Sequence, residues 1–259
     1  MQQLYGLIGR TLGHSFSRDY FNNKFENEGI DAEYVNFELP DIGDFMEAVA
    51  EAPNLCGLNV TIPYKEQIMP YLNALSDDAA SIGAVNTVAV EYDSRGGITL
   101  TGHNTDVIGF RDSIRPLIKP DMTRALVLGT GGASKAVVHG LRSLGIEPTL
   151  VSRTAAEGRL TYADLTPEVM DSHKVIVNTT PLGMWPDVDS CPGIPYGLLT
   201  SAHLCYDLIY NPDTTLFMRR AAEHGAEVKN GLEMLLLQAF AAWQIWQSTN
   251  APTTVASMI

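Results

Sequence analysis

The sequence predicts an α/β protein of two domains, each built on a mainly parallel β-sheet. Two observations carry this prediction. Along most of the 259 residues, short apolar runs typical of strands alternate with segments that have helical spacing, and such alternation builds parallel sheets. One apolar strand near the middle, residues 124–128, also runs straight into the glycine turn Gly129-Thr130-Gly131-Gly132 and then into a helix. A strand, a glycine turn and a helix in this order are typical of a doubly wound domain.

The first half of the chain carries the elements of an N-terminal α/β domain. Strand-like apolar runs occur at 3–9, 33–39, 55–61, 86–92 and 98–102, and a five-residue hairpin loop joins the last two. Helical spacing occurs at 16–28, 42–50 and 64–75, and Pro63 stands near the first turn of the third helix. We therefore expect a mainly parallel sheet with helices packed against it.

The second half repeats the alternation. It contains predicted strands at 124–128, 148–152, 174–178, 204–209 and 226–229, and predicted helices at 105–118 and 135–144. A long apolar helix at 233–247 follows the last strand, which suggests that it returns the chain to the first domain. We therefore predict a first domain of residues 1–106, onto which 233–259 packs back, and a second domain of residues 107–232.

Composition and charge narrow the classes of function. The formal net charge of −13 argues against nucleic acid or an anionic membrane as a partner, because both require basic surface. No run approaches the ~18 apolar residues of a membrane helix, and the N-terminus lacks the apolar core of a signal peptide. Three distant cysteines fit a reducing cytoplasm, and the six histidines lack ligand spacing, so no metal is predicted. We expect a monomer or a homodimer, with the apolar face of 233–247 in the core.

The glycine turn predicts a Rossmann-like dinucleotide site. Gly129 can make the tight turn after the strand, and Gly131 lets the backbone approach a pyrophosphate. The helix that begins near Gly132 presents free N–H groups and the positive end of its dipole to the phosphates. Ser134 stands where the motif usually has its third glycine. The predicted phosphate contacts are Gly129, Thr130, Gly131, Gly132 and Ala133.

The end of the next strand indicates which dinucleotide binds. Enzymes that use NAD usually have an acidic residue there, which holds the ribose 2′-hydroxyl. Here the position is occupied by Ser152-Arg153-Thr154. A guanidinium and hydroxyl groups favour a 2′-phosphate, so these residues predict NADP, whereas a solvated arginine in a loop is the alternative.

A lysine after the third strand is the candidate acid/base group. Asn59 and Thr61 lie two residues apart and therefore share one face of the strand end. Lys65 follows one short turn later, in the first turn of the predicted helix, where the helix dipole disfavours a cation. Such a position suits a group that gains and loses a proton. A surface lysine is the alternative.

Three further positions have two interpretations each. Thr105 or Asp106 in His103-Asn104-Thr105-Asp106 can cap a helix, or Asp106 can orient the Lys65 ammonium and accept from a substrate hydroxyl. Ser15 and Ser17 can cap a helix or donate to a carboxylate. Asn86 can be a turn residue or a substrate contact.

Taken together, these motifs resemble the shikimate dehydrogenase family, also described as quinate/shikimate dehydrogenases, over essentially the whole chain. Any one motif is modestly specific, but their number and order are very specific. The matching segments are Gly13-His14-Ser15-Phe16-Ser17, Asn59-Val60-Thr61-Ile62-Pro63-Tyr64-Lys65, Gly83-Ala84-Val85-Asn86-Thr87, Gly102-His103-Asn104-Thr105-Asp106, Gly129-Thr130-Gly131-Gly132-Ala133-Ser134, Asn178-Thr179-Thr180, Asp207-Leu208-Ile209-Tyr210-Asn211-Pro212 and Gly231-Leu232-Glu233-Met234-Leu235-Leu236-Leu237-Gln238.

The resemblance implies an N-terminal substrate domain, an NADP-binding domain, and the reversible reduction of 3-dehydroshikimate to shikimate in aromatic biosynthesis. It implies that Lys65 is the acid/base group, paired with Asp106. It places Leu208 and Gly231 beside the nicotinamide, and Asp77 at a position associated with cofactor. The residues expected to contact the substrate are Ser15, Ser17, Asn59, Thr61, Lys65, Asn86, Asp106, Tyr210 and Gln238.

Two departures from the family pattern concern the cofactor. Ser152 stands where the family has asparagine, and Glu157 stands where many members have a second basic residue, with Arg159 nearby. Dual use of NADP and NAD, as in a quinate/shikimate dehydrogenase, is therefore the main alternative. A methylenetetrahydrofolate dehydrogenase and a dinucleotide-binding regulatory module without turnover are the other two, and the Lys65/Asp106 pair argues against the regulatory module.

Overall fold

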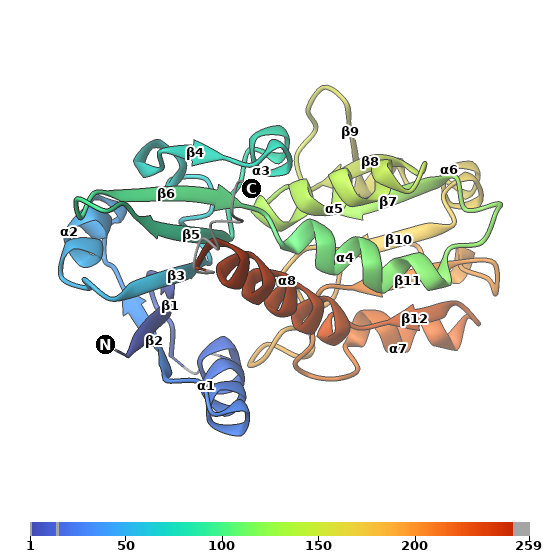
Figure 1. Cartoon of the computed structure of the whole chain (residues 1–259). Coiled ribbons are helices and arrows are strands. Elements are labelled where there is room, and N and C mark those ends of the chain that lie inside the picture. Colours follow the sequence, from blue (N-terminus) through green and yellow to red (C-terminus); the bar gives the residue numbers. More distant parts are fainter. Residues whose placement is uncertain (1, 14–15, 251–259) are drawn as a thin grey trace, which may run out of the picture. The chain divides into compact units, whose positions relative to one another are not determined.

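The computed structural model describes residues 2–13 and 16–250, and these form two compact units (Figure 1). Of the described residues, the first unit comprises 2–13, 16–105 and 239–250, and the second comprises Asp106–Gln238. Both units are α/β and both sheets are mainly parallel, which confirms the predicted fold class. No helix within the described residues is long and apolar enough to span a membrane.

The first unit contains a six-stranded sheet with the order β2-β1-β3-β5-β6-β4. β1 is parallel to β2 and β3, whereas β5 is antiparallel to β3 and β6. The strands are β1 (Gln3–Gly9), β2 (Ala32–Glu38), β3 (Leu55–Val60), β4 (Ala74–Leu75), β5 (Thr87–Tyr92) and β6 (Ile98–His103).

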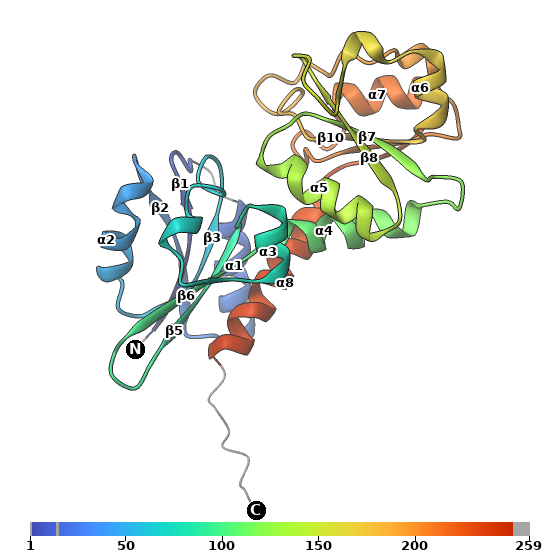
Figure 2. The same cartoon turned by 90° about the horizontal axis from the view of Figure 1, so that it is seen from above.

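Helices cover both faces of this sheet, as Figure 2 shows. Side chains alternate along β1, so that Ile8 joins the core beneath α2 while Tyr5 joins the core beneath α1 and the second half of α8. The helical segments of this unit are α1 (Phe16–Glu28), η1 (Ile42–Asp44), α2 (Phe45–Ala50), η2 (Met69–Tyr71), α3 (Asp77–Ile82) and the second half of α8 (Leu232–Asn250).

Trp246 holds α8 against the first sheet. Its side chain is fully buried, and its indole Nε1–H donates to the carbonyl oxygen of Val88 at 3.0 Å. The ring lies directly over Gly57, where a methyl group would come within 2.3 Å of the indole. The second half of α8 is therefore held on the first sheet by a hydrogen bond and by close packing.

The predicted helix at 64–75 is wrong. Residues 62–68 form turns, followed by η2 and the short strand β4. Pro70 lies inside the segment, and a proline in a helix interior removes a backbone donor and clashes with the preceding turn. Asn73 also favours the strand that forms instead of a helix. Its backbone N–H donates to the Leu100 oxygen at 2.9 Å, and its side chain accepts from the Leu100 N–H at 2.8 Å. These bonds bring the segment alongside β6.

The second unit contains a six-stranded, fully parallel sheet with the order β12-β11-β10-β7-β8-β9. The chain order reverses between β7 and β10, which is the switch point of a doubly wound sheet. The strands are β7 (Arg124–Leu128), β8 (Glu147–Ser152), β9 (Arg159–Thr161), β10 (Val175–Asn178), β11 (Leu204–Asp207) and β12 (Glu227–Lys229).

Two cores lie on opposite faces of the second sheet. Ala125 and Val127 of β7 pack toward α4 and α5, whereas Leu126 and Leu128 pack toward α6 and α7 (Figure 2). Met234, from the first half of α8, joins the α4 and α5 core. The helical segments are α4 (Asp106–Ile114), η3 (Arg115–Leu117), α5 (Gly132–Ser143), η4 (Tyr162–Asp164), α6 (Pro167–Ser172), η5 (Tyr196–Leu198) and α7 (Leu216–Glu223).

Candidate active site

Asn59, at the end of β3, lies inside a buried hydrogen-bond network. Its amide donates to the Asn86 carbonyl oxygen at 3.3 Å and to Thr87 Oγ1 at 3.2 Å, and its Oδ1 accepts from the Tyr34 hydroxyl at 2.8 Å. Burial raises the pKa of Tyr34 well above its ordinary value, and a hydrogen bond to Ser17 opposes this rise. Asn59 thus joins the start of α1 to the central strands, and its polar atoms have partners within the unit.

Asn86 fixes the segment that enters α4. Its Oδ1 accepts from the Thr105 backbone N–H at 2.6 Å, and its amide donates to Thr105 Oγ1 at 3.0 Å. Its backbone N–H donates to the His103 oxygen at 3.0 Å. Asp106 follows Thr105 directly and is the first residue of α4. Asn86 therefore also fixes the backbone just before this helix.

Lys65 is tied to the same edge of the first sheet by its backbone. Its carbonyl oxygen accepts from the Val85 N–H at 2.7 Å, which places it beside Asn86. Tyr64, the preceding residue, is fully buried and donates its hydroxyl to the Leu39 oxygen at 2.6 Å. Thr61 and Lys65 are both half-buried. No α-helix begins at Lys65, so the predicted effect of a helix dipole on its ammonium is wrong. The hydrogen bonds of this turn anchor the backbone of Lys65.

The first unit therefore gathers several predicted residues at the ends of β1, β3 and β5. Asn59, Thr61, Lys65 and Asn86 lie there, and Ser17 joins them through Tyr34. Ser15 lies outside the described residues. Asp77 is exposed at the first turn of α3. Tyr34 is a member of this network that the sequence did not indicate.

Asp106 and Gln238 lie on either side of a close helix contact in the second unit. A methyl group on Gly109 would come within 2.4 Å of the Met234 oxygen and 3.1 Å of the Gln238 side chain, so α4 and α8 touch at this point. Asp106 is the first residue of α4, one turn before Gly109. Both Asp106 and Gln238 are buried, and Gln238 donates its amide to the Leu235 oxygen at 3.0 Å.

The glycine turn has the geometry that a pyrophosphate needs. Gly129 has a φ of 108°, and a methyl group there would lie 2.8 Å from Thr179 Oγ1, so only glycine fits. Gly131 is exposed, and a methyl group on it would meet no atom within 4 Å. The twelve-residue helix α5 begins at the next residue, and Ser134 donates its hydroxyl back to the Gly131 oxygen at 2.6 Å. The exposed turn, with Thr130, Gly132 and Ala133 around it, fits the phosphates of a dinucleotide.

The end of β8 presents one guanidinium. Arg153 and Thr154 are exposed, and the Ser152 hydroxyl donates to the Thr154 oxygen. Burial raises the pKa of Tyr162, while the nearby charge of Arg153 lowers it. Glu157 is exposed in the loop that follows.

Leu208 and Gly231 touch through their backbones. A methyl group on Gly231 would come within 2.0 Å of the Leu208 oxygen, and the Gly231 N–H donates to the Ile209 oxygen at 3.0 Å. The glycine is therefore required for the close approach. Tyr210, in the same loop as Leu208, is 39% exposed.

Asp207, the residue that precedes this loop, was not among the predicted site residues. It is fully buried at the end of β11, and burial raises its pKa to about 6. Its carboxylate accepts hydrogen bonds from Asn178, Ile209 and Thr215. The motif that begins at Asp207 was visible in the sequence, but its hydrogen-bond partners on β10 and α7 were not.

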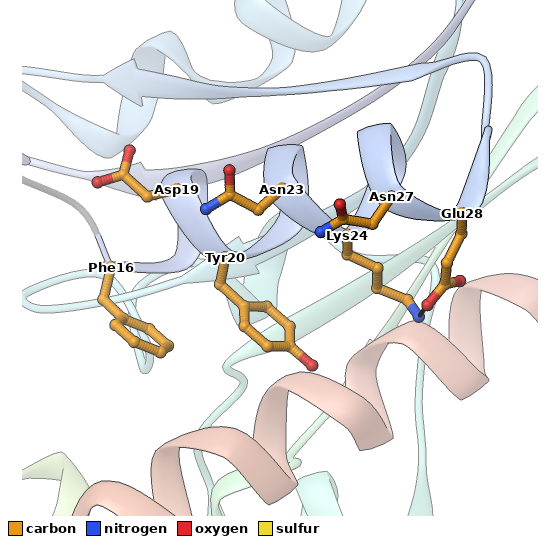
Figure 3. Close-up of a pocket in the computed structure, with 7 residues that line it drawn as sticks. All are labelled: Phe16, Asp19, Tyr20, Asn23, Lys24, Asn27 and Glu28. Atoms are coloured by element: carbon orange, nitrogen blue, oxygen red, sulfur yellow. Dashed lines mark hydrogen bonds and ion pairs between the residues drawn. The ribbon is translucent and has the colours of Figure 1, made fainter.

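An open groove of about 480 Å³ runs along α1 (Figure 3). Its lining contains none of the predicted site residues. Lys24, the cation in that lining, is paired with Glu28 at 2.5 Å and lies 5.5 Å from the centre of the Trp243 ring. Among the described residues, no three His, Cys, Asp or Glu side chains gather as metal ligands.

Comparison with known proteins identifies the family. Residues 7–88 match the model of the shikimate dehydrogenase substrate-binding domain. A curated relative from Caldicellulosiruptor saccharolyticus, named shikimate dehydrogenase (NADP(+)), is 36% identical over 95% of this chain and 92% of its own length. The chain belongs to the shikimate dehydrogenase family. The resemblance inferred from the motifs is thus confirmed.

Solved structures of the family have the same fold. Shikimate 5-dehydrogenase from Thermus thermophilus, in complex with NADP(H) and shikimate, superposes with a TM-score of 0.81 at 29% identity, covering 95% of this chain and 94% of that one. Quinate dehydrogenase from Corynebacterium glutamicum, in complex with NAD, superposes with a TM-score of 0.83 at 26% identity and the same coverage. One of these two similar structures thus holds NADP(H) and the other holds NAD.

Proposed function

We propose that this chain is an NADP-dependent shikimate dehydrogenase that interconverts 3-dehydroshikimate and shikimate. One observation carries the proposal: a lysine-bearing sheet edge and an open glycine turn occur in a chain that matches shikimate dehydrogenases over nearly its whole length. The three cysteines are free thiols, which agrees with the reducing cytoplasm that we infer for it.

In this proposal the chain's residues hold the substrate and move its proton. Lys65 donates a proton to the oxygen that develops negative charge on the ketone carbon, and recovers it in the reverse direction. Asp106 accepts from the neighbouring ring hydroxyl and orients the ammonium. NADP, when bound, supplies or accepts the hydride. Ser15, Ser17, Thr61, Asn86, Tyr210 and Gln238 hold the carboxylate and hydroxyl groups through neutral donors.

Asn59 has a supporting role in this scheme. Its amide and carbonyl bond to Asn86, Thr87 and Tyr34, so it fixes the side chains around it. These hydrogen bonds favour a supporting role for Asn59 over the substrate contact that the resemblance implies.

The cofactor is assigned along the edge of the second sheet. Gly129, Thr130, Gly131, Gly132 and Ala133 take the pyrophosphate, and Arg153, with Ser152 and Thr154, takes the 2′-phosphate. Leu208 and Gly231 would contact the nicotinamide, and Asp77 is a further proposed cofactor residue. A quinate/shikimate dehydrogenase that also uses NAD is the second candidate, because Glu157 supplies a negative charge near the 2′-phosphate end and a quinate dehydrogenase with NAD has a similar fold.

The test follows the absorbance of the reduced cofactor at 340 nm, NADPH with shikimate and NADP and then NADH with quinate and NAD. We expect the wild type to turn over shikimate with NADP, and Lys65→Ala to lower kcat by roughly 10²-fold or more with a small change in KM. Lys24→Ala, a lysine variant in the same unit, should leave kcat unchanged. Near-normal turnover by Lys65→Ala would contradict the role of Lys65. No turnover by the wild type with any of these pairs would contradict the function.

A further inference from the structure

The carboxylate of Asp207 is the meeting point of three hydrogen-bond donors. Its Oδ1 accepts from the Asn178 amide at 3.0 Å and from the Ile209 backbone N–H at 3.1 Å. Its Oδ2 accepts from the Thr215 hydroxyl at 2.7 Å. Since Asp207 is fully buried, the three donors use it instead of water.

One arm of this network leads to the glycine turn. Asn178, at the end of β10, accepts on its Oδ1 from the Thr180 N–H at 3.0 Å and the Thr180 hydroxyl at 2.7 Å. Thr179, between them, donates its N–H and its hydroxyl to the Leu128 oxygen at 2.9 and 2.7 Å. Leu128 precedes Gly129, whose missing side chain leaves room for Thr179 Oγ1. The position of the turn therefore depends on the end of β10.

The other arm closes the loop that carries Leu208 and Tyr210. Ile209 lies at the start of the loop, and Thr215 lies at its end, where its Oγ1 also accepts from the Met218 N–H at 3.3 Å and caps α7. One carboxylate thus holds both ends of the loop. Leu208 is pressed against Gly231 within this closed segment.

The strand order of the second sheet indicates which half of a bound dinucleotide lies near Asn178 and the Leu208–Tyr210 loop. Dinucleotides lie across the carboxyl ends of the strands at the switch point, here between β7 and β10. Arg153 marks the adenosine end, because it follows β8 on one side of the glycine turn. The nicotinamide half then extends over β10 and β11 on the other side.

We propose that Asp207 is a positioning residue for the nicotinamide half of the cofactor, joining the glycine turn to the Leu208–Tyr210 loop through Asn178, Ile209 and Thr215. The inference rests on the proposed function, because it takes the bound dinucleotide from there. It adds a residue that touches neither substrate nor cofactor but fixes the segments that do.

Asp207→Asn and Asp207→Ala differ in whether the three donors keep a hydrogen-bond partner. In Asp207→Asn the carbonyl oxygen still accepts from Asn178 and Ile209, and the new amide donates to Thr215, whose hydroxyl turns to accept. In Asp207→Ala all three donors lose their acceptor, and buried donors without an acceptor are costly. The loop should therefore keep its position in the asparagine variant and lose it in the alanine variant.

The experiment measures the affinities of two ligands by titration calorimetry. NADP⁺ contains both halves of the cofactor, and 2′,5′-ADP contains only the adenosine half with its 2′-phosphate. We expect Asp207→Ala to weaken NADP⁺ binding about tenfold or more, on the scale of lost buried hydrogen bonds, and to change 2′,5′-ADP binding less than about twofold. Asp207→Asn should bind both ligands nearly as the wild type does.

Tyr206→Phe is the matched control, because it removes the buried 2.7 Å hydrogen bond to Ser113 one residue earlier on β11. It should bind both ligands normally. An equal loss of both ligands in Asp207→Ala, or no loss of NADP⁺, would overturn the proposal. If that variant does not fold, Thr215→Val removes one donor and the same two ligands decide.

The wild type is measured first, so that failure of the proposed function is seen separately as absence of shikimate turnover. If the wild type prefers NAD, NAD⁺ and AMP replace the two ligands, with the same expected difference between them.

Discussion

Replacing Asp207 by asparagine should change how the stability of the second unit depends on pH. Burial raises the pKa of this carboxyl from an ordinary 3.8 to about 6, although its hydrogen bonds to Thr215, Ile209 and Asn178 oppose the rise. A shift of one pKa unit corresponds to about 1.4 kcal/mol. The difference between 3.8 and 6 therefore corresponds to roughly 3 kcal/mol of unfolding free energy.

The sign follows from the protons bound in each state. Between pH 3.8 and pH 6 the unfolded chain has an ionised Asp207, while the folded chain keeps it protonated. The unfolded state binds fewer protons in this range, so stability falls as the pH rises. The contribution is fully present below pH 3.8 and is lost as the pH passes through about 6.

Asparagine cannot titrate, so the comparison isolates this one group. The unfolding free energy of the wild type minus that of Asp207→Asn should fall by roughly 3 kcal/mol between pH 3.8 and pH 7. Urea unfolding followed by far-ultraviolet circular dichroism at several pH values measures it.

Asp112→Asn is the control, because its hydrogen bond to Arg111 lowers the pKa of Asp112 below 3.8. The wild-type-minus-Asp112→Asn difference should therefore rise with pH only in the acid range and stay nearly constant above about pH 5. A wild-type-minus-Asp207→Asn difference that stays constant as the pH passes through about 6 would refute the reasoning.

Two further predictions concern the anchored helix and the cofactor. Trp246→Phe removes the hydrogen bond to the Val88 oxygen and part of the packing on Gly57, and should lower the unfolding free energy of the first unit by about 1–3 kcal/mol in urea titrations. The control Trp185→Phe, at a site 66% exposed, should change this free energy little. Equal effects of the two variants would contradict the anchoring role of Trp246. Arg153→Ala should lower kcat/KM for NADP about tenfold or more and leave kcat/KM for NAD nearly unchanged, since a charge-assisted contact with the 2′-phosphate is lost. An unchanged ratio of kcat/KM with NADP to kcat/KM with NAD would show that Arg153 does not hold this phosphate.

The elements that the sequence predicted best are those whose burial matches their spacing. β1 and α1 have the bounds expected from their apolar residues, and so does β7. The predicted helix at 64–75 does not form because Pro70, inside the apolar pattern, breaks a helix. The strand β4 then depends on Asn73 bonding to Leu100, a residue distant in sequence, and no local pattern indicates such a contact.

The helices α3, α6 and α7 were missed for a different reason. Each has a side-chain cap, from Ser76, Thr166 and Thr215 respectively, and Pro167 occupies the first turn of α6. These signals were present in the sequence. The helices are only six to eight residues long, too short for hydrophobic periodicity to distinguish them from loops.

At the candidate site, residue types were easier to predict than their partners. The motifs indicated Asn59, Asn86 and Lys65 as polar groups of one region, and the structure places all three at one sheet edge. The motifs did not show which of these residues contacts the substrate and which only holds its neighbours in place. That distinction depends on Tyr34, which lies 25 residues from Asn59 on β2 and reaches it across β1, the strand between β2 and β3.

The chemistry of that edge follows from which groups build it. Tyr34, Asn59, Asn86, Thr87 and Thr105 hold one another through neutral donors and acceptors. Burial also lowers the pKa of His103, at the end of the neighbouring strand, and so favours the uncharged form of its ring. A network of this kind fixes positions without adding charge of its own. Its hydrogen bonds therefore hold the segments around Lys65 in place without adding a further charge beside the proposed acid/base group.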